Sequence, residues 1–145
     1  MLKITDLCVN YGRVRAVQNL TLEVNQGELV GLVGHNGAGK TTTLMTIAGV
    51  LRPVSGDVLF QGRSLIGTAP DEILRSGISL VPEGRRIFAR LTVGENLRIG
   101  TTVRRDRKRA DDDLKRLLER FPVLERDWAK SGAKLAEEHQ RAEDH

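Results

Sequence analysis

The stretch GHNGAGKTT, residues 34–42, follows an apolar run and precedes a segment with helical spacing. It satisfies the pattern G-x-x-x-x-G-K-[ST], which is typical of a phosphate-binding loop between a strand and a helix. Glycines at 34, 37 and 39 let successive backbone N–H groups point inward, and the N-terminus of the helix adds its positive dipole end. The stretch therefore predicts a polyphosphate site.

Side-chain chemistry predicts the roles within this loop. We expect Lys40 to reach the β- and γ-phosphates, the Thr41 hydroxyl to ligate Mg²⁺, and Thr42 to contact the α-phosphate side. A glycine-rich turn without function is the less favoured alternative, because a strand and a helix flank the loop. The predicted nucleotide-binding residues of the loop are Gly34, Asn36, Gly37, Ala38, Gly39, Lys40, Thr41 and Thr42.

The segments around the loop predict an α/β fold. Residues 2–9, 16–20 and 21–24 are rich in β-branched side chains and read as strands separated by Gly12 and Asn19. The apolar runs 29–33 and 78–82 read as buried strands, and the first is typical of a parallel sheet covered on both faces. Residues 56–62 predict a further short strand.

Helical periodicity predicts the remaining elements. After the loop, Leu44, Ile47 and Ala48 share one face of a predicted helix. A short helix is expected from Pro70 to the residue before Gly77, and Thr92 with Glu95 has capping-box spacing. A longer amphipathic helix is predicted over 107–121, with an apolar face of Ala110, Leu114, Leu117, Leu118 and Phe121.

Composition sets wide bounds. A chain of 145 residues, 39% hydrophobic and 29% charged, suits one soluble globular domain, and its net charge of +4 suits an anionic ligand. The lone Cys8 is interpreted as a small core residue in a reducing compartment. The basic run 104–109 could contact nucleic acid, but a solvated helix start is favoured, because Asp106 interrupts the run and acidic residues 111–113 follow it.

Two stretches together carry a resemblance: VNYGRVRAVQNLTLEVNQGELVGLVGHNGAGKTT (9–42) and SLVPEGRRIFARLTVGENLRIG (79–100). The chain resembles an ABC transporter ATP-binding subunit, which implies ATP and Mg²⁺ as cofactors. The implied architecture is a P-loop NTPase core with an N-terminal antiparallel β layer and a partial α-helical subdomain. The expected divisions are the core over 1–100, the partial helical subdomain over 101–135, and a divergent polar tail over 136–145.

The resemblance also implies roles for two residues outside the loop. Tyr11 matches the aromatic residue that stacks on adenine, with an ordinary strand-end tyrosine as the alternative. Glu83 stands at the Q-loop position, where most of the superfamily has Gln, and would contact Mg²⁺. With GRRIF after it, Glu83 is similar to the LivF-type subunit of branched-chain amino-acid importers, and a related urea or amide importer is the alternative.

The implied partners are transmembrane permease subunits and a second ABC ATPase subunit in a homo- or heterodimer. Phe88 to Leu97 would face the permease, and no nucleic-acid partner is expected. The implied location is the cytoplasmic face of the inner membrane in a bacterium or archaeon, as a peripheral subunit held through its partners. The apolar segment 29–33 would expose an edge if its neighbouring strands were missing.

The hydrolytic half of the family pattern is not recognised in these residues. No apolar strand ends in paired Asp-Glu, no switch histidine can be assigned, and Ala136-Glu137-Glu138 stands where the signature motif has Ser-Gly-Gly. The abrupt break near Leu135 favours a frameshift, a truncated gene or a fragment. No catalytic residue is assigned, and a nucleotide-binding chain without hydrolysis is the alternative to an ATPase.

Overall fold

The computed structural model describes residues 1–84, 86–104 and 106–134, and it consists of two compact units. The first unit is Met1–Val81 and the second begins at Pro82. The predicted division at residue 100 instead lies within helix α3 (Val93–Thr102), because the segment after Pro82 packs with the helices that follow it. Each unit is described by itself.

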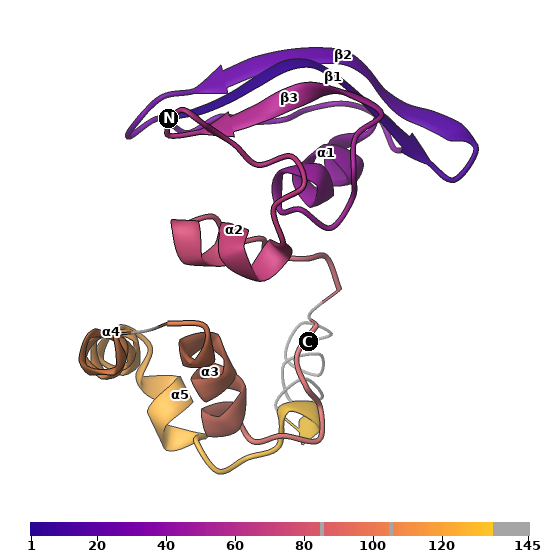
Figure 1. Ribbon diagram of the computed structural model, residues 1–145. Coiled ribbons are helices and arrows are strands. Elements are labelled where there is room, and N and C mark those ends of the chain that lie inside the picture. Colours follow the sequence, from indigo (N-terminus) through magenta and orange to yellow (C-terminus); the bar gives the residue numbers. More distant parts are fainter. Residues whose placement is uncertain (85, 105, 135–145) are drawn as a thin grey trace. The chain divides into compact units, whose positions relative to one another are not determined.

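The first unit is built on an antiparallel sheet with the strand order β2-β1-β3-β4. Figure 1 shows β2, β1 and β3 side by side. The strands β1 (Leu2–Tyr11) and β2 (Val14–Val24) form a hairpin around Gly12, whose φ of 61° requires the left-handed region that glycine tolerates. β3 (Ser55–Phe60) pairs with the other edge of β1, and the short β4 (Arg63–Ser64) follows it. The predicted N-terminal antiparallel layer is therefore present.

Asn19 does not separate two strands, as the sequence predicted, but lies inside β2. Its φ of 46° marks an irregularity of pairing, and the ladder with β1 shifts register between Leu7 and Val9. The Asn19 side chain accepts a hydrogen bond from the Cys8 thiol at 3.1 Å, and the Asn19 N–H donates to Cys8 Sγ at 3.3 Å. Cys8 is half-buried and forms hydrogen bonds with Asn19. The prediction that it is a small core residue was therefore wrong.

The two apolar runs predicted as buried strands are not strands in this structure. Residues 29–33 are irregular and solvent-exposed, with Leu29 98% and Val33 91% exposed. The run 78–82 is likewise irregular, and Val81 is 89% exposed. A strand requires a hydrogen-bonded neighbour, and no described segment pairs with either run. The expectation of a parallel sheet is thus wrong for the described residues, whereas the expected exposure of residues 29–33 agrees with the structure.

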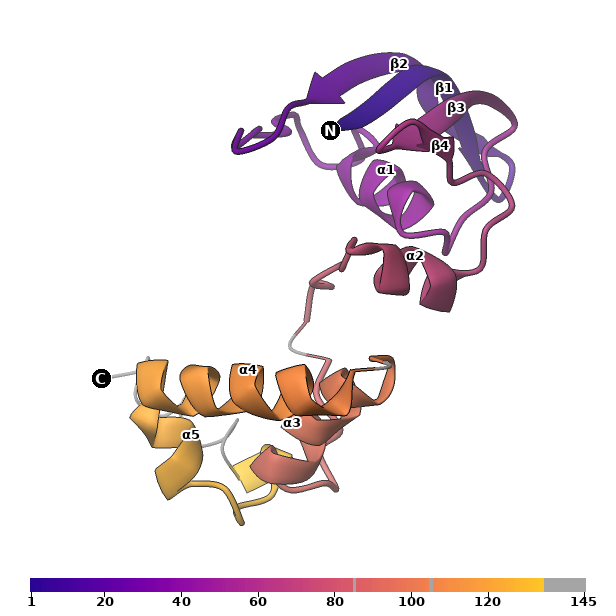
Figure 2. The same cartoon turned by 60° about the vertical axis from the view of Figure 1, so that its left-hand side comes forward.

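Helix α1 (Lys40–Ile47) packs against the inner face of the sheet, and α2 (Pro70–Ser76) lies beside it (Figure 2). The buried positions of α1 are Thr43 and Thr46, whereas Leu44 is 45% exposed, so the predicted apolar face of this helix is only partly correct. α2 has Pro70 at its start and Gly77 after its end, as predicted. The core of the unit consists of Ile4, Leu7, Val9, Val17, Val58, Leu65 and Ile73.

The second unit is helical (Figure 2), with α4 (Arg107–Arg120) and α5 (Pro122–Arg126) packed against α3. The predicted capping box is present: Thr92 Oγ1 accepts from the Glu95 N–H at 3.1 Å, and Glu95 Oε2 accepts from the Thr92 N–H at 2.7 Å. Within the described ranges, no helix is long and apolar enough to cross a bilayer.

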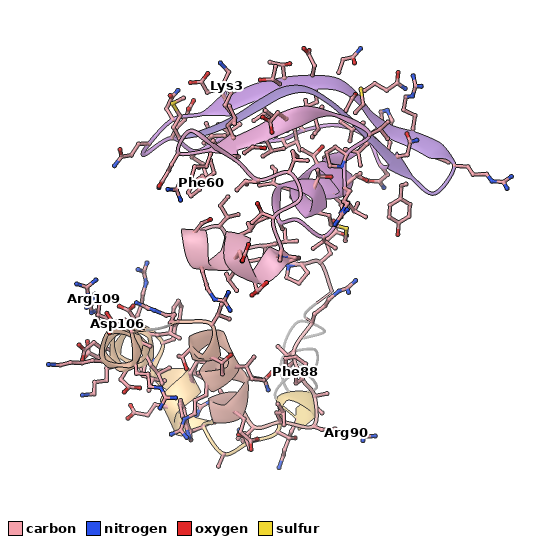
Figure 3. All side chains as sticks on the ribbon, in the orientation of Figure 1. Lys3, Phe60, Phe88, Arg90, Asp106 and Arg109 are labelled. Carbon is pink, nitrogen blue, oxygen red and sulfur yellow. The ribbon has the colours of Figure 1, made fainter. Side chains whose placement is uncertain are left out.

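The basic run 104–109, which includes the first three residues of α4, is partly neutralised by acidic neighbours. Asp106 caps the helix by accepting from the Arg109 N–H at 3.1 Å, and its carboxylate lies 3.3 Å from Arg109 Nε (Figure 3). Arg104 forms an ion pair with Asp113, which lowers the pKa of that carboxyl group through the hydrogen bond between them. These contacts favour the interpretation as a helix start.

The turn after α5 is held by the carboxylate of Asp127, which is only 2% exposed. Arg126 donates from Nε and Nη2 to its two oxygens at 3.0 Å each, and Lys130 Nζ lies 3.1 Å from Oδ1. The hydrogen bonds from Arg126, together with Lys130, outweigh burial and lower the pKa of Asp127 from its usual 3.8 to about 2.

This pKa predicts how the stability of the second unit depends on pH. A carboxyl group with a lowered pKa in the folded state stabilises that state above the unfolded pKa, and the contribution is lost as the pH falls through the folded value. We expect the unit to weaken between about pH 4 and about pH 2, and Asp127→Asn to flatten the part of this dependence that comes from Asp127. Unfolding followed by Trp128 fluorescence over this range tests it; an equally steep loss in the variant would contradict it.

Candidate phosphate-binding site

The predicted phosphate loop lies in the first unit, between the exposed run 29–33 and α1. A turn closes it, in which the Ala38 N–H donates to the His35 carbonyl at 3.1 Å. Gly37 and Gly39 both have a φ of 86°, in the left-handed region. At these two positions the glycines are therefore needed for the backbone itself.

Gly39 has a second reason to be glycine. A Cβ on this residue would lie 2.4 Å from the Ala16 carbonyl oxygen and 3.0 Å from Val17 Cγ2. The end of the loop thus rests directly against the backbone of β2. This contact ties the loop to the hairpin that carries Tyr11.

Lys40 folds back across the loop. Its Nζ donates to the carbonyl oxygens of Gly34, at 2.7 Å, and His35, at 2.8 Å. The ammonium group therefore lies at the start of the loop, although its Cα is in the first turn of the helix. A single positive charge thus lies among the loop atoms, which suits an anion.

The N-terminus of α1 is open to an anion. Its N-cap is Gly39, no side chain caps the helix, and its first turn contains no acidic residue. The backbone N–H groups of a first helical turn have no partner within the helix, and the helix dipole favours negative charge there. Two buried threonine hydroxyls donate to backbone carbonyls one turn earlier: Thr43 to the Gly39 carbonyl at 2.9 Å and Thr46 to the Thr42 carbonyl at 2.8 Å. They anchor the helix start without competing for the ligand.

The residues predicted on either side of the loop differ in their placement. Tyr11 ends β1 in the same unit as the loop, and the residue is 62% exposed. Glu83 is exposed in the second unit, where Arg86 Nε donates to its carbonyl at 3.3 Å. Tyr11 and residues 34–42 belong to the same unit, and the roles of Tyr11 and Glu83 both stay predictions.

The donor set for a metal ion is small. Among the described residues, no three His, Cys, Asp or Glu side chains gather at one place. Thr41, in the first turn of α1, supplies a hydroxyl oxygen of the kind that Mg²⁺ accepts beside phosphate oxygens and water. A hydroxyl at this position fits a Mg²⁺ ion that binds together with a phosphate ligand.

Sequence reasoning missed three contributors to the site. His35 supplies a carbonyl to Lys40, Ala16 of β2 supports Gly39, and the Thr43 hydroxyl fixes the end of the loop. The spacing of four residues between Gly39 and Thr43 could have indicated the last of these, because a threonine hydroxyl in a helix reaches the carbonyl one turn back. Nothing in the sequence pattern indicates the other two.

Fold and site together define a phosphate-loop NTPase domain: an antiparallel layer, a glycine loop supported by it, and a helix with an uncapped N-terminus. The family model described as ABC transporter matches residues 17–141. This match covers most of the chain and continues past residue 135, where the resemblance was expected to end. The chain belongs to the ABC transporter family.

Individual relatives agree with this family. The chain is 41% identical over 124 residues to the high-affinity branched-chain amino acid transport ATP-binding protein BraG of Pseudomonas aeruginosa, covering 86% of this chain and 53% of BraG. It is 37% identical over 111 residues to the ribose import ATP-binding protein RbsA 2 of Streptomyces avermitilis, covering 77% of this chain and 22% of that protein.

A solved structure of an ATP-binding subunit of an ABC transporter superposes with a TM-score of 0.77 at 30% identity, over 90% of this chain and 54% of that one. The predicted fold class, an α/β P-loop NTPase of the ABC type, is confirmed by this likeness and by the family match. The chain spans about half the length of BraG and of the solved subunit.

Proposed function

We propose that this chain binds ATP with Mg²⁺ at residues 34–42 as part of an ABC importer subunit. The observation that carries the proposal is the position of the Lys40 ammonium group, held on the Gly34 and His35 carbonyls beside the uncapped start of α1. A triphosphate entering the loop would meet this charge and the backbone N–H groups together. Tyr11, at the neighbouring hairpin, would stack on the adenine.

Mg²⁺ would be held by the Thr41 hydroxyl and by oxygens of the bound phosphates, and the role of Glu83 as a further Mg²⁺ ligand stays a prediction from the resemblance. When bound, the ion neutralises phosphate charge during phosphoryl transfer. Thr41 is suited to this position because the first turn of α1 places it next to Lys40.

The transported solute is proposed to be a branched-chain amino acid. The support is the 41% identity to BraG and the Glu83-containing stretch that the sequence singled out. RbsA 2, a ribose import protein by name, is also similar to this chain. The proposed solute therefore rests on the similarity to BraG and not on the fold, which both relatives share. A urea or amide importer remains the alternative of the same type.

The proposed permease-facing surface contains Phe88 and Arg90, which project from the segment before α3 (Figure 3). Asn96 of α3 holds this segment: its Oδ1 accepts from the Phe88 N–H at 2.8 Å, and its Nδ2 donates to the Phe88 carbonyl at 3.0 Å. Ile87 and Phe88 are 46% and 57% exposed, so apolar side chains are presented on a fixed backbone. A permease contact here would hold the chain at the cytoplasmic face of the membrane, beside a second ABC subunit.

Calorimetric titration with ATP and Mg²⁺, followed by a phosphate-release assay on the same sample, tests the function. Binding with release supports an ATPase, whereas binding without release supports the nucleotide-binding alternative, in which hydrolysis needs groups other than those assigned here. Failure of ATP to bind the folded chain would contradict the proposal.

The ring of Tyr11 offers a further check. If it stacks on the adenine, Tyr11→Ala should lower the affinity for ATP more than the affinity for inorganic triphosphate, which has no base.

A further inference from the structure

A cavity in the first unit lies between the β3–β4 hairpin and α2. Its volume is about 430 Å³, within the range of about 300–1,000 Å³ that is usual for small-molecule sites. Neither Tyr11 nor any of residues 34–42 lines it. The function proposed above therefore gives this cavity no role.

The floor of the cavity is apolar. Leu65 and Ile73 line it and are 7% and 1% exposed, and the partly buried Phe60, also in the lining, packs against the same core. Figure 3 shows Phe60 on the side of the sheet that faces α2. These three side chains come from β3, from the turn after β4 and from α2, so separate elements fix their positions. The floor can therefore bury an aliphatic group of a ligand.

The rim of the cavity carries two opposite charges from different elements. Arg63 of β4 and Glu72 of α2 both line the cavity and are both exposed. Within the described ranges, neither side chain forms an ion pair or a hydrogen bond, with the other or with any further residue. Asp71 and Arg75, which also belong to α2 but lie outside the lining, instead pair with each other at 2.8 Å. Arg63 and Glu72 thus remain available to a ligand that carries both charges.

Two hydroxyl groups of the lining are already engaged within the protein. Ser64 Oγ donates to Asp57 Oδ1 at 2.6 Å, and Ser76 Oγ donates to the Ile73 carbonyl at 2.7 Å. These hydrogen bonds fix the hairpin and the end of α2. A ligand is therefore selected mainly by the two charges of the rim and by the apolar floor.

We propose that this cavity binds a free α-amino acid with an aliphatic side chain, such as leucine. The carboxylate of the ligand would lie against Arg63, its ammonium group against Glu72, and its side chain on the apolar floor. A neutral apolar molecule would leave both charges without a partner, and glycine would leave the floor uncovered. The solute proposed above belongs to the same class, but the inference is drawn from the cavity alone and holds whether or not the chain binds ATP.

The test is a titration of the full chain with L-leucine in the absence of nucleotide, followed by amide NMR. Signals of residues 60–76 are expected to shift, with a Kd of about 1 mM because the rim charges are exposed. The analogue 4-methylpentanoate lacks the ammonium group and 3-methylbutylamine lacks the carboxylate, so each should bind about fivefold more weakly. Glycine keeps both charges but has no side chain, and it should bind about tenfold more weakly.

Variants of the rim assign the two contacts. Arg63→Gln and Glu72→Gln should each lower the affinity for L-leucine by about fivefold. Arg75→Gln and Asp71→Asn are the matched controls, because they remove the same charges from residues of α2 outside the lining, and the Kd should stay close to wild type.

Three results would each overturn the inference: no shift in the signals of residues 60–76 with L-leucine, equal affinities for L-leucine and glycine, or equal losses in the rim variants and their controls. None of them bears on ATP binding, which the calorimetric titration measures separately. The amide spectrum of each variant also shows whether it is folded. If one rim variant is not, the other variant with its own control decides.

Discussion

Lys40→Met is expected to lower the affinity of the chain for ATP by about 10- to 100-fold while leaving its folding almost unchanged. A hydrogen bond to a charged group contributes about 1.5–3 kcal/mol, and each 1.4 kcal/mol is a factor of ten in affinity. Methionine keeps the length of the side chain but has neither charge nor donor. The two carbonyls that Lys40 contacts, on Gly34 and His35, belong to exposed residues and can bind water instead.

Lys3→Met provides the matched control for this variant. Lys3 lies in the same unit, and its side chain projects from the sheet on the face away from α1 (Figure 3). The substitution removes the same charge from the protein without touching the loop, so ATP affinity should stay close to wild type. An equal loss of ATP affinity in both variants would mean that the net charge of the protein, and not the loop, attracts the nucleotide. An unchanged affinity in Lys40→Met would remove the main support for the proposed site.

Gly94→Ala is expected to destabilise the second unit by about 2–3 kcal/mol, the upper part of the range for overpacking. A Cβ at this position would lie 2.2 Å from Trp128 Cε2 and 2.4 Å from Nε1. The indole cannot easily give way, because the backbone on both sides is paired: the Gly94 N–H donates to the Trp128 carbonyl at 3.0 Å, and the Val93 N–H donates to the Lys130 carbonyl at 2.9 Å. Arg98 also covers the ring, 5.8 Å from its centroid.

Gly100→Ala is the control in the same helix. Nothing lies within 4 Å of a Cβ at Gly100, so alanine should stabilise the helix by about 0.5–1 kcal/mol through its propensity. Trp128 is the chain's one tryptophan, so its fluorescence during urea unfolding reports on the second unit. Opposite shifts of the two midpoints are expected. A Gly94→Ala midpoint at or above that of wild type would show that the helix start can move away from the indole.

Elements specified by nearby residues could be predicted from the sequence. The capping box of Thr92 and Glu95, the start of α2 at Pro70 and the glycines of the phosphate loop all depend on groups a few positions apart. Residues 29–33 and 78–82 have the composition of buried strands but no pairing partner among the described segments. An apolar composition indicates that a segment can be buried, but a strand also needs a neighbouring strand to pair with. The two strand predictions were wrong because this second condition is not met among the described segments.

The site shows the same limit at the scale of side chains. The pattern around Lys40 predicted a phosphate loop, and family membership agrees with it. The contact of Gly39 with Ala16 and the hydrogen bond that orients His35 come from the path of the backbone, which no spacing rule encodes. The predicted roles of Tyr11 and Glu83 came from resemblance, and binding measurements on variants at these positions test them.

The connectivity of the first sheet has a consequence for biosynthesis. Its four strands are drawn from residues 2–64, and β1 pairs with β2 through a tight turn and with β3 across β2, the glycine loop and α1. Pairings between segments close in sequence form rapidly, and domains fold from the N-terminus while the chain is still being made. The β1–β2 hairpin, which supports the glycine loop through Ala16, can therefore form while the rest of the chain is still being synthesised.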